Sequence, residues 1–212
     1  MTTEPVPFKL GRSFDLNTAL WTWWQHLQQQ TQIAEPVTSH EDATEEAIAS
    51  NKKADFSKFP PPASTAARAE LRRLDCLADV MVSPHYQRLY QWLVQRKVIA
   101  PIGNAQQLPS YQVQQLKQLA LLVGLLALIR KNASGKNGEL MSAGDGQPVV
   151  SELRFRRLLA STDLDDLYGQ LRRIIPLMNH QLNVRDLIAE IGQWDSEVMP
   201  TPQTWAYAYH WA

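Results

Sequence analysis

Cysteine is almost absent from this chain of 212 residues, since Cys76 is the only one. A single thiol excludes a disulfide framework and any zinc or iron–sulfur site that needs several cysteines. Long apolar runs are missing too: the longest, residues 119–129, has 11 residues, whereas a membrane-spanning helix needs about 20. The first residues also lack the apolar stretch of a signal peptide. These absences predict a soluble, cytoplasmic protein with no membrane contact.

Patterns that mark an active site are missing as well. The five histidines show no paired spacing typical of metal ligands, and SGKNG at 134–138 lacks the strand and glycine spacing of a phosphate loop. Three aspartates, at 163, 165 and 166, fall in the first turn of a predicted helix, where capping and the helix dipole account for them. Cys76 lies in a Leu-rich stretch and is predicted to be inert packing. We therefore expect no catalytic residues, no metal site, no cofactor and no enzymatic activity.

Excess charge of one sign is missing from the whole chain but present in its parts. Lys plus Arg and Asp plus Glu are both 21, and the isoelectric point is about 7.0. Residues 1–66 hold 5 basic and 8 acidic side chains, residues 67–160 hold 13 and 6, and residues 161–212 hold 3 and 7. A uniformly basic nucleic-acid coat is excluded, and a polyanionic partner is expected to bind mainly to the middle of the chain.

Helical periodicity runs through most of the sequence, and strand patterns are nearly absent. The first helix, 14–30, places its apolar side chains on one face, and residues 119–129 are apolar on nearly all sides, as in the buried centre of a bundle. Capping signals mark several other helix starts. After the first helix, a helical stripe runs from Ser64 to Val82 through Leu71, Leu74, Ala78 and Met81. Pro176 is expected to kink or end the helix that contains it. Further helices are predicted to begin at Ser83-Pro84, Ser110, Ser151, Thr162 or Asp163, Asn183 and Thr201-Pro202.

These segments predict an all-α fold of two small helical bundles joined by a flexible connection. The N-terminal bundle covers residues 1–131 and contains a disordered insertion at 31–62, which is acidic, polar and ends in three prolines. Residues 132–150, rich in glycine, form the linker. Residues 151–212 form the C-terminal bundle.

Arginines on two of the predicted helices lack nearby acids. Around Phe155, Arg154 and Arg157 lie on one outer flank of their helix and Arg156 on the other, with Glu152 the one nearby carboxylate. This pattern favours contact with phosphate over a merely solvated face. In the next predicted helix, Arg173 projects outward and Arg172 lies at the flank of the buried face.

The arginines of ARAELRRL allow two interpretations. Arg72 has Asp75 and Asp79 within one or two turns, and such pairs stabilise a helix by about 0.3–0.5 kcal/mol. For Arg68, Arg72 and Arg73, ion pairing on a solvated face and phosphate contact are therefore equally supported. Arg130 and Lys131 end a helix, where the dipole accounts for them.

Several motifs, taken in order, resemble one known family. After an N-terminal Trp-rich helix come RAELRR, a buried Leu-rich helix, RFRRLLAS, LYGQLRRIIPLMN, DLIAEIGQW and a final WAYAYHWA. This series is similar to the CasB family, the small subunit of the type I-E CRISPR Cascade complex. The resemblance covers residues 14–30 and 64–212 and is most specific from Ser151 to Trp194.

The resemblance implies an all-α, non-catalytic subunit of a crRNA-guided surveillance complex. Family members sit as a pair, so the expected partners are a second copy and the backbone and large subunits of Cascade. Their basic surface is thought to hold the displaced single-stranded DNA of the R-loop. On the matching motifs this role falls to Arg72 and Arg73 of RAELRR, Arg154, Arg156 and Arg157 of RFRRLL, and Arg172 and Arg173 of QLRR.

Our leading hypothesis is thus a Cascade subunit that binds single-stranded DNA and bridges its neighbours. The alternative is a helical protein–protein adaptor whose arginines contact acidic protein surfaces, and the WAYAYHWA tail fits burial against a partner. A third, weaker hypothesis is an accessory of a nuclease or helicase. Salt-sensitive binding to unrelated single strands separates the first hypothesis from the second.

Overall fold

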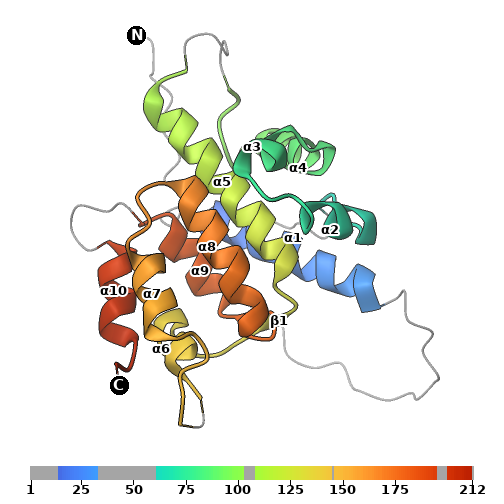
Figure 1. Cartoon of the computed structure of the whole chain (residues 1–212). Coiled ribbons are helices and arrows are strands. Elements are labelled where there is room, and N and C mark those ends of the chain that lie inside the picture. The colour runs from blue at the N-terminus through green and yellow to red at the C-terminus, as the bar shows by residue number, and fades with distance from the viewer. Residues whose placement is uncertain (1–13, 33–60, 103–107, 145, 195–199, 212) are drawn as a thin grey trace, which may run out of the picture.

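The computed structural model describes residues 14–32, 61–102, 108–144, 146–194 and 200–211 (Figure 1). Within these ranges the chain forms ten helices and two strands of two residues each, which confirms the predicted all-α class. The elements are α1 (Phe14–Gln32), α2 (Thr65–Leu71), α3 (Leu77–Val82), α4 (Pro84–Gln95), α5 (Ser110–Leu128), β1 (Lys131–Asn132), α6 (Asn137–Ser142), α7 (Glu152–Leu159), α8 (Leu164–Leu177), β2 (Gln181–Leu182), α9 (Val184–Ile191) and α10 (Thr201–Ala208).

The C-terminal half of α5 is the centre of the core. Every residue from Leu116 to Leu128 except Lys117 is buried, as the apolar sequence predicted. In Figure 1, α5 runs between α2–α4 on one side and α8 and α9 on the other, and it contacts α1, α2, α3, α8 and α9. A helix surrounded in this way removes its whole circumference from water, which accounts for the absence of a polar face.

The stripe predicted from Ser64 to Val82 is two helices rather than one. The chain leaves the helical path after Leu71 and enters α3 at Leu77, so the apolar phase restarts and Ala78 is exposed, contrary to the prediction. Cys76 is also exposed, at the N-cap of α3, and does not pack in the core.

Side chains of α8 support this break. The Tyr168 hydroxyl donates to the carbonyl of Leu74 at 2.9 Å, and Arg172 donates to the carbonyl of Arg72 at 3.2 Å. A backbone that leaves a helix loses hydrogen-bond partners, and these two bonds replace them. The partners lie about 100 residues away, where a local sequence pattern cannot reveal them.

Most of the predicted helix starts are confirmed by their caps. Ser83 accepts from the amide of Tyr86 at 3.2 Å, directly before Pro84. Asp163 and Asn183 accept from the amide three residues on, at 2.8 and 3.2 Å. Ser151 occupies the N-cap of α7 without a side-chain bond. Pro176 lies in the last turn of α8, which ends one residue later.

The segment predicted as a linker contains ordered elements. β1 pairs in parallel with β2, with Lys131 opposite Gln181, and α6 follows within the same segment. One cluster of buried apolar side chains includes members from α1 through α10. The division at 132–150 into two bundles stays a prediction. Most of the predicted insertion 31–62, residues 33–60, lies outside the described residues, and no described helix could cross a membrane.

Candidate nucleic-acid interface

The three arginines of α7 all project from its outer side. Phe155 and Leu158 are buried, so the amphipathic sequence turns Arg154, Arg156 and Arg157 to the surface, as predicted. This orientation follows from burying the apolar stripe of the helix.

The α7 arginines differ in their partners. Arg156 pairs with Glu152 at 3.0 Å, and its guanidinium lies 5.5 Å from the ring centre of Trp211. Arg154 and Arg157 have no ion pair with any residue that the structure describes. Two of the three positive charges are therefore available to an anion.

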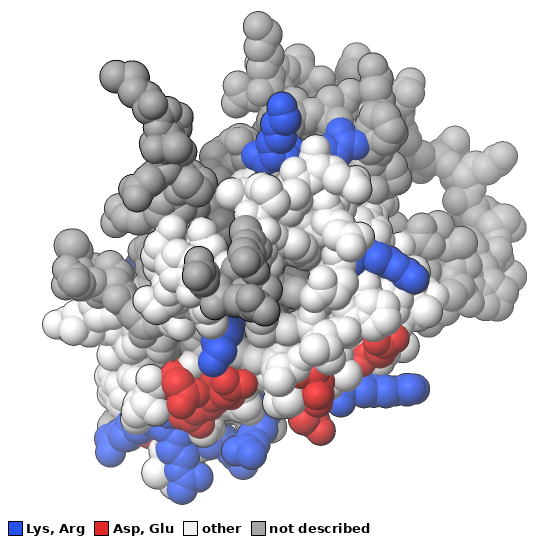
Figure 2. All heavy atoms as spheres, turned by 90° about the horizontal axis from the view of Figure 1, so that it is seen from above, with Lys and Arg blue, Asp and Glu red and all other residues white. Residues whose placement is uncertain are grey.

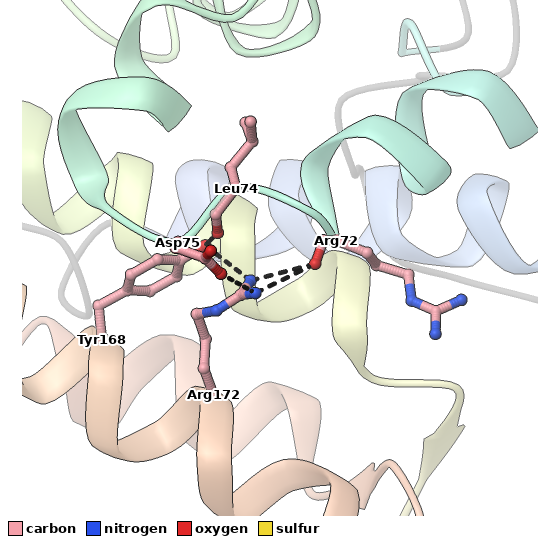
Figure 3. Close-up of polar contacts among 5 residues, drawn as sticks. All are labelled: Arg72, Leu74, Asp75, Tyr168 and Arg172. Atoms are coloured by element: carbon pink, nitrogen blue, oxygen red, sulfur yellow. Dashed lines mark hydrogen bonds and ion pairs between the residues drawn. The ribbon is translucent and has the colours of Figure 1, made fainter.

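Arg172 of α8 is held inside a contact between two segments. Its Nη2 lies 2.7 Å from Oδ1 of Asp75 and both terminal nitrogens donate to the carbonyl of Arg72. Its guanidinium also lies 5.5 Å from the ring centre of Tyr168, and 17% of its side chain is exposed. Figure 3 shows this arrangement joining α8 to the turn after α2. Arg173, next along the helix, is exposed.

The arginines at the end of α2 do not form the intrahelical pairs that the sequence allowed. In Figure 3 the guanidinium of Arg72 points away from Asp75, whose carboxylate binds Arg172 instead. Burial, and next the charge of Arg130, lower the pKa of Arg72. Arg73 is exposed.

Arg68 is a structural residue. It is 5% exposed, and its guanidinium donates to the carbonyls of Ala127 and Ile129, both at 3.2 Å, and to Oε1 of Gln28 at 2.9 Å. These bonds cap the C-terminal end of α5, where carbonyls have no partner within the helix. Burial first, then the charges of Arg72 and Arg130, lower its pKa to about 10.

A family model described as CRISPR-associated protein Cse2 matches residues 67–210, which is more than half of the chain and includes every arginine discussed above. The chain belongs to the Cse2 family. Its resemblance to the CasB small subunit of type I-E Cascade is thereby confirmed, and the protein is a subunit of a multisubunit CRISPR complex. Comparisons with curated proteins and with solved structures found no match.

The fold of this Cse2 protein brings together some of the predicted site residues. The guanidinium of Arg172 binds the backbone carbonyl of Arg72, which joins α8 to the end of α2 at one junction. Arg73 and Arg173 follow these two residues in the chain, and both are exposed. α7 packs beside α8. Within the described residues, no hydrogen bond or ion pair joins the α7 arginines to those at the junction.

Two groups beside the junction were not among the predicted site residues. Burial is the main cause of the lowered pKa of His180; the bond to the Leu128 carbonyl opposes it, and the charges of Arg130 and Arg72 lower it further. The sequence predicts that Arg130 compensates the helix dipole and that His180 is an ordinary surface or core residue. Arg72, Arg130 and His180 lie on segments that meet only in the folded chain. Their spacing in the sequence therefore could not show that they influence one another.

The positive charges do not cover the whole Cse2 surface. Figure 2, seen from above the N-terminal end of α5, shows a largely uncharged face with separate Lys and Arg side chains and with Asp and Glu among those at its lower edge. Lys117 and Asp165 form an ion pair at 3.7 Å. A polyanion would meet no continuous basic patch on this face. Within the described residues, no three His, Cys, Asp or Glu side chains gather as metal ligands would.

Proposed function

We propose that this Cse2 protein is a non-catalytic Cascade subunit that binds the displaced single-stranded DNA of the R-loop. The observation that carries the proposal is the pair Arg154 and Arg157, two exposed guanidinium groups on one flank of α7 with no carboxylate partner in the described structure. Two cations on one flank with no acid beside them repel each other, and an anionic ligand relieves this repulsion. Binding of this kind needs no cofactor.

The chemistry of these groups fits a phosphate backbone. Guanidinium groups donate paired hydrogen bonds to phosphate oxygens. Such contacts carry no sequence information, so the subunit would hold any displaced strand. This matches a role in which the guide RNA, and not the small subunit, selects the sequence.

The remaining predicted residues contribute unequally. Arg73 and Arg173 are exposed and contact phosphate. Arg72, whose guanidinium points away from Asp75 and Arg172, contacts phosphate on its own side of α2. Arg156 and Arg172 already pair with Glu152 and Asp75. Their charges add to the local potential, but an exchange of partners would be needed before either binds phosphate directly.

Exposed apolar side chains near α7 support the bridging part of the proposal. Leu153 is 61% exposed and Tyr207 of α10 is 86% exposed, while Trp211 packs on Phe155. Large apolar groups left in water favour contact with protein. We assign this region to neighbouring Cascade subunits in the cytoplasm: the backbone subunits, the large subunit or a second copy. It is also the observation that favours the alternative, an adaptor that binds protein alone.

Fluorescence anisotropy with a labelled, mixed-sequence single strand tests the proposal. The full chain is compared with R154Q/R157Q over a range of salt concentrations. If each exposed contact contributes about 1 kcal/mol, the double variant binds roughly 25-fold more weakly at low salt. Its log–log salt slope also decreases by about 1.4, because a single strand gives a slope of about 0.7 per phosphate contact.

R88Q is the matched control for this measurement. Arg88 is exposed on α4 and has no ion pair within the described residues, so R88Q removes one charge away from α7. Its binding should stay close to that of the unmodified chain. Equal binding by R154Q/R157Q and the unmodified chain would contradict the role of α7, and failure of the unmodified chain to bind at low salt would favour the adaptor.

A further inference from the structure

The side chain of Asn137, the first residue of α6, is completely buried and binds α6 to α9. Its Oδ1 accepts from the amide of Asn183 at 2.9 Å, while its Nδ2 donates to the carbonyl of Asn183 at 3.2 Å and to Oε2 of Glu190 at 2.7 Å. Asn183 is the N-cap of α9, and Glu190 lies in the last turn of that helix. An amide suits this place because it donates and accepts at once, and a buried group without a partner would weaken the fold.

Gly138, the next residue, lies where α6 and α10 pack together. A Cβ atom added there would lie 2.8 Å from the carbonyl oxygen of Trp205 and 3.0 Å from the Cβ atom of Ala208, both on α10. Glycine is therefore needed for this close approach of the two helices. Thr201, at the start of α10, also donates to the carbonyl of Glu190 at 2.6 Å. The packing of α6, α9 and α10 thus requires asparagine directly followed by glycine.

Asparagine followed by glycine is prone to lose its side-chain amide, and Asn137–Gly138 is the one such pair in the sequence. The backbone nitrogen of the glycine attacks Cγ of the asparagine, because no glycine side chain shields that nitrogen, and Nδ2 takes its proton and leaves as ammonia. Water then opens the resulting five-membered imide at either carbonyl. The products are aspartate and isoaspartate, in which the main chain runs through Cγ. The reaction consumes one water molecule and needs no oxidant, reductant or enzyme.

The folded structure holds this pair in an unreactive state. Asn137 and Gly138 are both buried, so water is kept from the hydrolysis step. Ring closure also needs the asparagine side chain to turn toward the nitrogen of Gly138, and this turn breaks its three bonds to Asn183 and Glu190. The reaction therefore requires α6 to leave α9, and its rate follows the fraction of chains in which this contact is open.

The product of the reaction does not fit the same place. An ionised carboxylate at position 137 has no donor, so it faces Oε2 of Glu190 and the carbonyl of Asn183 as a third acceptor. Burial raises the pKa of Glu190, and the bond from Asn137 opposes this rise. Loss of that bond, together with a second buried carboxylate at hydrogen-bond distance, makes the contact repulsive.

We propose that Asn137–Gly138 is a deamidation site which the docking of α6 keeps closed, and whose conversion to aspartate or isoaspartate stops α6 from docking again on α9 and α10. Each opening of α6 exposes the pair to reaction, and refolding cannot reverse the change. α10 packs on α6 and carries Tyr207, whose exposed ring belongs to the region that we assign to neighbouring subunits. A converted chain therefore loses part of that surface, and this consequence does not depend on DNA binding.

The first experiment measures the reaction in the full chain at mildly alkaline pH, in buffer and in urea, by mass spectrometry of the peptides that contain Asn137. Asn132 is the control, because alanine follows it in the same segment. We expect conversion of Asn137 to be at least about 10-fold slower in buffer than in urea, and in urea to be faster than that of Asn132. Equal rates for Asn137 in the two solutions would overturn the closed site, and equal rates for both asparagines in urea would overturn its reactivity.

The second experiment tests the fit of the product with N137D, E190Q, N137D/E190Q and the control N132D, in urea unfolding followed by circular dichroism. N132D adds the same charge, but Oδ1 of Asn132 accepts from the amide of Val184 at 3.0 Å, a bond that a carboxylate keeps. We expect N137D to lower the urea midpoint more than N132D does. N137D/E190Q should recover part of this loss, because the amide introduced at position 190 donates to the new carboxylate.

Two results of the second experiment would overturn the proposal. Equal midpoints in N137D and N132D would show that the product docks as asparagine does. A midpoint in N137D/E190Q no higher than that in N137D would show that Glu190 does not exclude the product. If N137D does not fold at all, folding of N137D/E190Q supports the proposal and its failure to fold contradicts it.

Discussion

The arginines of this Cse2 protein divide by what their guanidinium groups touch. Arg68 and Arg172 donate to backbone carbonyls and hold segments of the core together. Arg154, Arg157 and Arg173 project into water. Stability and ligand binding are thus assigned to different arginines, although the residue type and the local sequence are similar.

Replacing Arg172 should destabilise the fold, whereas replacing its neighbour should not. R172Q loses the bonds to the carbonyl of Arg72, and we expect a loss of about 1–2 kcal/mol, discounted because Asp75 is largely exposed. R173Q should change the free energy of unfolding by less than about 0.5 kcal/mol. Urea unfolding followed by circular dichroism measures both, and a larger loss in R173Q would contradict the assignment.

His180 should titrate below its ordinary pKa of 6.5. Burial is the main cause, the bond to Leu128 opposes it, and the charges of Arg130, Arg72 and Arg68 lower it further. Because the folded state then binds protons less readily than the unfolded state, His180 contributes stability above pH 6.5 that is lost as the pH falls through its lowered pKa.

Proton NMR titration tests this, with H180Q to assign the resonance. R130Q should raise the pKa of His180, since one of the three facing charges is removed. R88Q serves as the control and should leave it unchanged. An identical pKa in R130Q and the unmodified chain would show that Arg130 does not face His180.

At the residue scale, the sequence predicted which arginines are exposed better than it predicted which residues they bind. The helical periodicity correctly turned Arg154 and Arg157 outward, because their positions follow from burying Phe155. It could not show that Arg172 binds Asp75, since 97 residues separate them. It could not place Cys76 either, because the break after α2 depends on bonds from α8.

At the scale of elements, α5 and α8 approach closely at a glycine. A Cβ atom added to Gly124 would lie 2.5 Å from the hydroxyl oxygen of Tyr168. That ring cannot easily move aside, because Tyr168 is fully buried and its hydroxyl donates to Leu74. The absence of a side chain at Gly124 thus lets α8 reach the turn after α2, where Arg172 and Arg72 meet.

Two glycines offer a matched test of this packing. G124A should destabilise the fold by about 1–2 kcal/mol, because overpacking outweighs the gain in helix propensity. Gly169 lies on α8 with nothing within 4 Å of an added Cβ atom, so G169A should stabilise the fold by about 0.5–1 kcal/mol. Chemical denaturation of both variants gives the comparison. Stabilisation by G124A would mean that α5 and α8 pack less closely than described.

At the scale of elements, the sequence predicted helix starts correctly where a local N-cap residue determines them. Ser83, Asp163 and Asn183 each cap a helix that the sequence placed correctly, because a cap depends on residues within one turn. The strands β1 and β2 were not predicted, since each has two residues and pairs with a segment about 50 residues away.

At the scale of the molecule, the chain has no net charge but an uneven distribution of charge. The acids at the face in Figure 2 stand among the cations, whereas Arg154 and Arg157 on α7 and Arg72 and Arg130 near the end of α5 lack acid partners within the described structure. Composition alone could locate the basic excess in residues 67–160 but not the faces on which it lies. Membership of the Cse2 family gives these faces a context, a Cascade complex.

The most direct test of the central claim probes the displaced strand in Cascade itself. The complex is assembled on a matched target with the unmodified subunit, with R154Q/R157Q or with R88Q, and the permanganate reactivity of displaced-strand thymines is measured. We predict that these thymines react more strongly in the complex with R154Q/R157Q than in the complexes with the unmodified subunit or R88Q, because the displaced strand loses its phosphate contacts. The pairing of guide RNA with the target strand should be equal in all three complexes. Equal reactivity in all three complexes would contradict the claim that these arginines hold the displaced DNA.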